Sequence, residues 1–171
     1  MKPSLLLILL LATTGAATRA AEASKTKAGA SKKTVVTQPM PTAANVAYGT
    51  HERQVLDFYK APSDQPTPLL FFIHGGGWVT GDKKNPGSLA QCLKAGISVV
   101  SINYRYSWQA HLAGVMPPVQ WPLQDAARAL QFVRSKAAEW NIDKQRIGAS
   151  GGSAGACSSL YLAFHDDLAD P

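Results

Sequence analysis

Ser153 lies in the stretch Gly151-Gly152-Ser153-Ala154-Gly155, a Gly-x-Ser-x-Gly pattern that can support nucleophilic chemistry. Acyl transfer needs an activated nucleophile and hydrogen-bond donors that face the developing oxyanion. When this pattern joins a strand to a helix, the turn holds the serine exposed and strained, and the outer glycines avoid collisions with neighbouring backbone. The N–H of Ala154 and the start of the helix face the same spot. Ser153 is therefore a candidate nucleophile, with a flexible Gly-Ser turn as the alternative.

A second glycine cluster, His74-Gly75-Gly76-Gly77-Trp78, follows an apolar stretch earlier in the chain. Consecutive glycines let backbone N–H groups turn toward a substrate oxygen without obstruction by side chains. The alternatives are a turn that ends a strand and a phosphate-binding loop. A phosphate-binding loop needs a following Lys-Ser or Lys-Thr, or Gly-x-Gly-x-x-Gly spacing, and neither is present. Together the two motifs, in this order, favour a hydrolase that transfers acyl groups.

The surrounding sequence predicts the elements that position these motifs. Apolar runs and turn residues predict strands at 46–48, 55–59, 69–73, 97–103 and 146–150 and helices at 86–95, 122–140 and 153–164. Such alternation after an initial hairpin indicates an α/β fold with a mostly parallel sheet and right-handed crossovers. Ligands of these sheets bind beyond the carboxyl ends of the strands, where both glycine motifs lie.

Local signals set the expected limits of the helices. Asn85 is a suitable N-cap for the first helix, and Gly96 is a natural stop. The longest helix carries its apolar residues on one face, with Asp125 in a first turn where negative charge favours the helix dipole. The helix at 153–164 is apolar on nearly every side, which is typical of a helix in the middle of a fold. Residues 104–121 are expected to be irregular.

The basic balance of the chain is confined to its first part. The net charge is +6, yet residues 45–171 hold eleven basic and ten acidic residues and no clustered basic stripe, which excludes a nucleic-acid partner. Residues 1–20 have the pattern of a secretory signal peptide, with Lys2 before an apolar run of eight residues. That run is too short for a stable membrane anchor. We therefore expect a secreted or periplasmic protein, with a disordered linker at 21–44 and one partial domain at 45–171.

No metal site or cofactor is predicted. The two cysteines, Cys92 and Cys157, each lie in a predicted apolar helix and are interpreted as separate buried thiols rather than a disulfide. The four histidines and two cysteines show no metal-ligand spacing.

The motifs resemble those of the esterase/lipase group related to hormone-sensitive lipase, and most of all its bifunctional feruloyl and acetyl-xylan esterase-like branch. Besides the two glycine motifs, the similarity includes Gly-Asp-Lys at 81–83, Asn-Tyr-Arg at 103–105 and Trp-Asn-Ile-Asp at 140–143, and it covers about residues 45–171. It implies the N-terminal half of an α/β-hydrolase fold. It also implies substrates that are small acyl esters or acylated polysaccharides.

The resemblance assigns roles to residues of both motifs. Ser153 would be the nucleophile, and the backbone N–H groups of Gly76, Gly77 and Ala154 would form the oxyanion hole. His74 would orient the glycine loop rather than act as the base. Supporting positions are His74, Gly75, Gly151 and Gly155.

The chain departs from this pattern in its catalytic acid and base. The order in this fold is Ser, then Asp or Glu, then His, and the only histidine after Ser153 is His165. Twelve residues of helix would place His165 about 18 Å along the axis, too far to accept the serine proton. His51 and His111 precede the nucleophile; His51 is expected to be exposed, and His111 is a candidate substrate contact. We expect a fragment that lacks the acid and histidine and is inactive alone, or else a short protein completed by another chain.

The sequence leaves two other functions open. The chain could be a non-catalytic remnant that binds carbohydrate or a partner on the same scaffold. It could also derive from a serine peptidase of the same fold, although the His-Gly-Gly-Gly loop favours esters.

Overall fold

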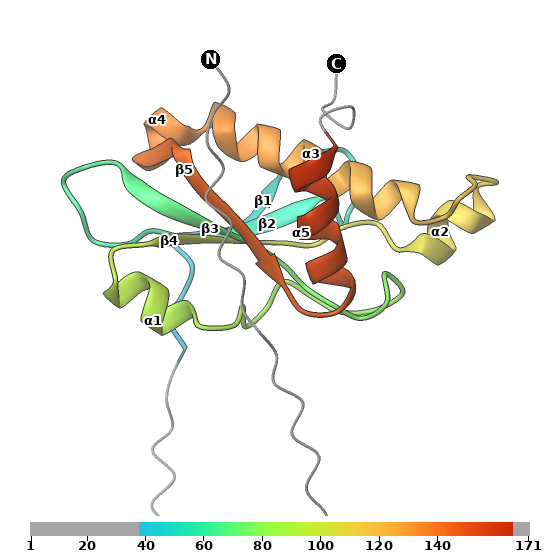
Figure 1. Cartoon of the computed structure of the whole chain (residues 1–171), viewed down its shortest axis with the longest axis horizontal. Coiled ribbons are helices and arrows are strands. Elements are labelled where there is room, and N and C mark those ends of the chain that lie inside the picture. The colour runs from blue at the N-terminus through green and yellow to red at the C-terminus, as the bar shows by residue number, and fades with distance from the viewer. Residues whose placement is uncertain (1–37, 166–171) are drawn as a thin grey trace, which may run out of the picture.

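The computed structural model describes residues 38–165 as a five-stranded mixed sheet with helices packed on both faces (Figure 1). The strands are β1 (Ala43–Ala47), β2 (Val55–Tyr59), β3 (Thr67–Ile73), β4 (Ser98–Ile102) and β5 (Ile142–Gly151), in the order β1-β2-β4-β3-β5. The predicted signal peptide, most of the predicted linker, and Asp166, Asp167 and Asp170 lie outside the described residues.

The sheet combines the predicted hairpin with a parallel core. β1 and β2 pair antiparallel, β2 also pairs antiparallel with β4, and β3 pairs in parallel with both β4 and β5. All five residues of β4 are buried, whereas β3 alternates buried and half-buried positions. β1 begins at Ala43, inside the stretch predicted as linker, because its residues pair with β2.

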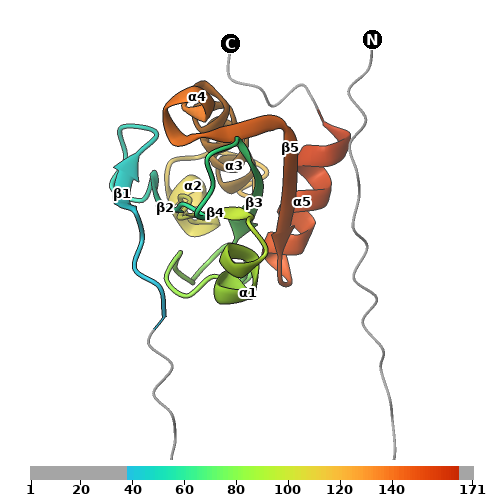
Figure 2. The ribbon, with the colours of Figure 1, turned by 90° about the vertical axis from the view of Figure 1, so that its left-hand side faces the viewer.

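The helices form two layers around the sheet, as Figure 2 shows. α3 (Gln120–Ser135), α4 (Ala137–Trp140) and α5 (Ala154–Phe164) cover one face, where the main core includes Phe58, Phe71 and Val133. α1 (Leu89–Lys94) covers the opposite face over a smaller cluster of Tyr59, Leu89 and Val99. Coverage of both faces explains the continuous apolar run at 69–73 in β3, the central parallel strand.

Several predicted boundaries were wrong. The first helix begins at Leu89 rather than residue 86, because Asn85 has a left-handed backbone (φ 58°) and does not cap it. Residues 104–121, predicted as irregular, contain α2 (Ser107–Leu112). The predicted helix at 122–140 starts at Gln120 and divides at Lys136 into α3 and α4. β5 is longer than the predicted strand at 146–150.

Two predictions of burial were also wrong. α5 is not enclosed among the described residues, since Leu160 and Phe164 are 47% and 77% exposed. Cys157 on the same helix is exposed and Cys92 is half-buried, so neither is the buried thiol that was predicted, although both are free as expected. No helix within 38–165 is long and apolar enough to cross a membrane, and no cluster of three metal-ligating side chains occurs in that range.

Two ion pairs anchor loops at the edge of the sheet, one to strand β2 and the other to helix α3. Lys83 Nζ lies 2.8 Å from Asp57 Oδ2 on β2, and both side chains are less than a tenth exposed. Arg105 donates to both oxygens of Asp125, which also accepts from Gln54 Nε2 at 2.8 Å. Asp125 is fully buried and lies beyond the first turn of α3, so its partner is Arg105 and not the start of the helix as predicted.

The Lys83–Asp57 pair can be tested by replacing one partner. We expect Lys83→Ala to lower the free energy of unfolding by about 3–5 kcal/mol, because a buried carboxylate loses its partner. Lys84→Ala changes the adjacent, exposed lysine and should alter that free energy by less than about 0.5 kcal/mol. Urea unfolding measures both, and equal effects would contradict a stabilising role for the pair.

Candidate active site

The two glycine motifs leave the sheet side by side. Ile73, the last residue of β3, pairs in parallel register with Gly151, the last residue of β5. A Cβ atom built on Gly75 would lie 2.7 Å from the carbonyl oxygen of Gly152 and 3.6 Å from the Cβ of Ser153. The 74–78 loop and the turn that carries the candidate nucleophile are therefore in contact.

Ser153 occupies a strained turn at the end of β5. Its backbone angles are φ 53° and ψ −120°, a region that residues other than glycine rarely adopt, and the residue is exposed. The turn is closed by a 3.0 Å hydrogen bond from the N–H of Gly155 to the carbonyl of Gly152. α5 begins at the next residue, Ala154, so the strand-to-helix context that the motif requires is present.

The outer glycines of the motif are required by close packing. A Cβ atom on either Gly151 or Gly155 would collide with the carbonyl oxygen of Ile73, and one on Gly155 would also lie 2.9 Å from the carbonyl oxygen of His74. Any side chain at these two positions would push the turn away from the end of β3. Gly148, on the same strand, has no atom within 4 Å of such a Cβ.

The glycine loop after β3 adopts a left-handed backbone over three consecutive residues. Gly76, Gly77 and Trp78 have φ angles of 98°, 61° and 59°. The carbonyl of Gly76 accepts hydrogen bonds from Val79 and Thr80 at 3.0 and 3.1 Å, which closes a tight turn. Both Gly76 and Gly77 are exposed. Within residues 38–165, no group accepts a hydrogen bond from the N–H of either glycine.

His74 is a buried structural residue of this loop. Its Nδ1 donates a 2.8 Å hydrogen bond to the carbonyl oxygen of Gly75, and its ring stacks on Tyr104 with 4.3 Å between centroids. Burial lowers the pKa of the imidazole from its ordinary 6.5, with a smaller opposing effect of the Gly75 carbonyl. His74 is thus neutral at pH 7, with Nδ1 engaged by the loop it belongs to.

Tyr104 and Arg53 support the same loop; Tyr104 was noted only as part of the motif at 103–105, and no role was predicted for either residue. The Tyr104 hydroxyl donates to the carbonyls of His74 and Gly75 at 2.9 and 3.1 Å, and burial raises its pKa, so it stays protonated. Arg53 Nε donates 2.8 Å to the carbonyl of Tyr104, and its guanidinium also reaches the carbonyl of Gly81. The Asn-Tyr-Arg and Gly-Asp-Lys motifs were the sequence signal for these contacts.

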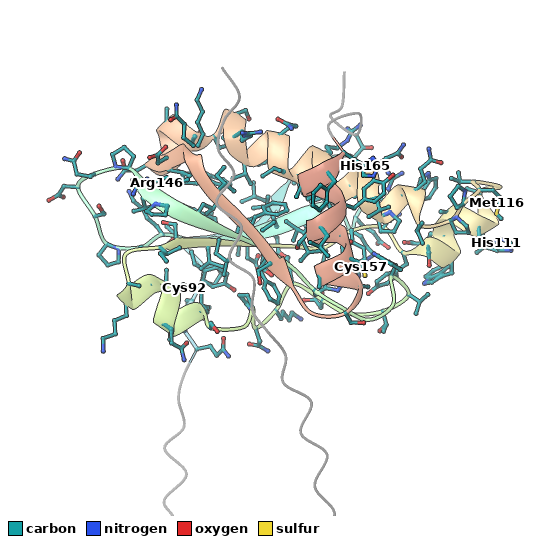
Figure 3. All side chains as sticks on the ribbon, viewed as in Figure 1. Cys92, His111, Met116, Arg146, Cys157 and His165 are labelled. Atoms are coloured by element: carbon teal, nitrogen blue, oxygen red, sulfur yellow. The ribbon has the colours of Figure 1, made fainter. Side chains whose placement is uncertain are left out.

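The structure places the other three histidines at the end of α5, on α2 and in the β1–β2 turn. His165 is exposed at the far end of α5, stacked on Tyr161, and Figure 3 shows it well separated from Cys157 in the first half of the helix. His111 is exposed in the last turn of α2, at the end of the molecule where Figure 3 also labels Met116. His51 is half-buried in the turn of the β1–β2 hairpin, where its Nδ1 accepts from the N–H of Arg53.

A surface hollow of about 560 Å³ lies away from these motifs. It is lined at the start of β5 by Asp143, Lys144 and Arg146, with Arg134 of α3 beside them. Ser153 follows the opposite end of β5, so this hollow is not the space above the candidate nucleophile.

Comparison with known proteins identifies esterases. The family model described as BD-FAE matches residues 56–169. A probable carboxylic ester hydrolase of Mycobacterium tuberculosis, LipM, is 34% identical over 70% of this chain and 28% of its own length. Gut esterase 1 of Caenorhabditis elegans is 31% identical over 69% of this chain and 22% of its own length. The chain therefore spans about a quarter of the length of these relatives.

Solved structures agree with this result. A truncated form of a carbohydrate esterase from gut microbiota superposes with a TM-score of 0.59 at 34% identity, over 70% of this chain and 41% of that one. An acetyl ester-xyloside bifunctional hydrolase from Caldicellulosiruptor lactoaceticus gives 0.51 at 30% identity, over 61% of this chain and 36% of that one. The predicted fold class, part of an α/β-hydrolase, and the predicted resemblance are confirmed.

The packing of the turn at 151–155 predicts unequal effects of two glycine substitutions. Gly155→Ala is expected to cost about 1–3 kcal/mol of unfolding free energy, because its methyl group collides with two rigid backbone carbonyls. Gly148→Ala, on β5, meets open space and should be nearly neutral. Thermal and urea unfolding compare them, and a neutral Gly155→Ala would contradict the described packing.

The buried imidazole predicts a pH dependence of stability. Because the pKa of His74 is lowered in the folded state, the unfolded chain binds its proton first, and stability declines as pH falls below about 6.5. The decline is at most about 1.4 kcal/mol per pH unit. His74→Gln should remove this contribution, whereas His111→Gln at an exposed site should keep it. Urea unfolding between about pH 7.5 and 5.5 tests this; an unchanged slope in His74→Gln would contradict it.

Proposed function

Because the chain belongs to the BD-FAE family, we propose that it supplies the nucleophile and oxyanion donors of a serine carboxylic-ester hydrolase. The observation that carries this proposal is the contact between the strained, exposed Ser153 and the glycine loop after β3. A nucleophile and several unengaged backbone N–H groups at one sheet edge are the parts that acyl transfer requires.

In the proposed reaction, Ser153 Oγ attacks the ester carbonyl carbon as its proton passes to a base. The carbonyl oxygen becomes the oxyanion of a tetrahedral intermediate, held by the N–H groups of Gly76, Gly77 and Ala154. Collapse of the intermediate expels the alcohol, which takes up the proton and leaves an acyl-serine. Water then attacks the acyl carbon in the same way and releases the acid. Donors fixed before the reaction lower the barrier because they need no reorganisation.

The base and its acid partner are assigned to no residue between 38 and 165. His74 is neutral and bonded within its loop, and His165 lies at the far end of α5. We propose that the 171 residues alone do not complete a triad. The matched segment covers only 28% and 22% of the length of the two relatives. Activity is therefore best measured in the protein expressed from its natural reading frame.

The proposed substrates are small acyl esters, including acyl groups on polysaccharide. The two similar solved structures, a carbohydrate esterase and an acetyl ester-xyloside bifunctional hydrolase, support this class. Export to the periplasm or medium is proposed from the signal-peptide pattern of residues 1–20.

Replacing the candidate nucleophile tests the proposal. In the protein expressed from its natural reading frame, Ser153→Ala should abolish both p-nitrophenyl acetate hydrolysis and labelling by a fluorophosphonate, because the attacking oxygen is removed. Ser150→Ala, at an exposed serine of β5, should leave both unchanged. Mass spectrometry locates the label.

Other results would overturn the proposal in distinguishable ways. A folded protein that neither labels nor hydrolyses esters would favour a binding role on this scaffold. Cleavage of peptide p-nitroanilides in preference to esters would favour a peptidase. Full activity in the isolated 171-residue chain would contradict the view that its triad is incomplete.

A further inference from the structure

Trp78 and Ser158 form a hydrogen bond that links the glycine loop to α5, the helix that follows Ser153. The indole Nε1 of Trp78 donates a 3.0 Å hydrogen bond to Ser158 Oγ, across eighty residues of sequence. The Ser158 hydroxyl in turn donates to the carbonyl of Ala154 at 3.0 Å. Ser158 is only 1% exposed, so water does not compete for either bond. We call this chain of bonds from Trp78 to Ala154 the clasp.

Hydrogen bonds from Ser107 also fix the backbone of Trp78. Its carbonyl accepts hydrogen bonds from the N–H of Ser107 at 2.8 Å and from the Ser107 hydroxyl at 3.2 Å, both from the start of α2. The left-handed φ of 59° at Trp78 needs such support, because this conformation is unfavourable for a bulky residue. Trp78 is therefore fixed by α2 through its backbone and by α5 through its indole.

We propose that the clasp sets the separation between the two sources of oxyanion donors, and that Ser158 is a positioning residue for the reaction. This inference rests on the proposed function. One source is the pair of N–H groups of Gly76 and Gly77, which directly precede Trp78 in the glycine loop. The other is the N–H of Ala154, the residue whose carbonyl accepts the hydrogen bond from Ser158. Both must reach one carbonyl oxygen, and an error of about 1 Å in such geometry can cost up to a hundredfold in rate.

The neighbouring serine provides a matched control within the same helix. Ser159 makes the same type of bond one residue later, from its Oγ to the carbonyl of Gly155 at 2.9 Å. Among the described residues, however, no group of the glycine loop donates to Ser159. The two hydroxyls thus form the same type of hydrogen bond within the helix, but only Ser158, the more buried of the two, is also bonded to Trp78.

Alanine substitution of each serine separates positioning from helix stability. Ser158→Ala is expected to lower kcat for p-nitrophenyl acetate by roughly ten- to a hundredfold with little change in KM, because the displaced donors act on the transition state. Ser159→Ala should change both constants less than about twofold. Trp78→Phe should reproduce the Ser158→Ala effect, and the double variant should be no worse than either single one, since each substitution breaks the same Trp78–Ser158 hydrogen bond.

The outcomes decide the proposal even if a variant is unstable or the enzyme is inactive. Equal kinetics for Ser158→Ala and Ser159→Ala, a change in KM alone, or additive losses in the double variant would overturn it. If the unsubstituted protein hydrolyses no ester, the proposed function fails. Hydrogen exchange of the backbone amides at 75–80 then tests whether the clasp fixes the glycine loop. Faster exchange in Ser158→Ala than in Ser159→Ala supports it, and equal exchange overturns it.

Discussion

The site depends on the close approach of two backbones at one sheet edge. The carbonyl oxygen of Ile73, at the end of β3, occupies the space that Cβ atoms on Gly151 and Gly155 would need. That contact brings the start of α5 to the end of the neighbouring strand and holds Ser153 in its unfavourable conformation. Strain of this kind costs about 1–3 kcal/mol and persists only where the surroundings over-determine it. Parallel pairing of β3 with β5 supplies these surroundings.

A second set of contacts fixes the glycine loop from the opposite side. Tyr104 holds the carbonyls of His74 and Gly75, and Arg53 reaches from the hairpin turn to Tyr104 and Gly81. The antiparallel strands at the edge of the sheet therefore have a role beyond extending it. They carry the charged side chains that hold the loops after β3 and β4. A loop whose carbonyls are engaged in this way presents its N–H groups outward.

Local pattern was sufficient for much of the fold. The strand cores, the hairpin, the parallel arrangement and the strand-to-helix position of Ser153 follow from apolar runs and glycine placement, which are properties of neighbouring residues. The errors occurred where tertiary packing overrides local preference. Asn85 is a good cap by type, yet its backbone is left-handed in the loop that packs against Asn103 through Lys83. α5 is apolar on most sides, but a large part of its surface is exposed.

The sequence by itself determined the residue types of the candidate site, a serine between flanking glycines at 151–155 and a run of three glycines at 75–77, because each pattern lies within a few consecutive residues. It also determined the motifs at 81–83 and 103–105 without showing what they do. Tertiary structure decided that Lys83 pairs with Asp57, that Tyr104 holds the glycine loop, and that Trp78 meets Ser158. These partners lie far apart in the chain, and hydrogen bonds between distant residues leave no periodic signal that local pattern could reveal.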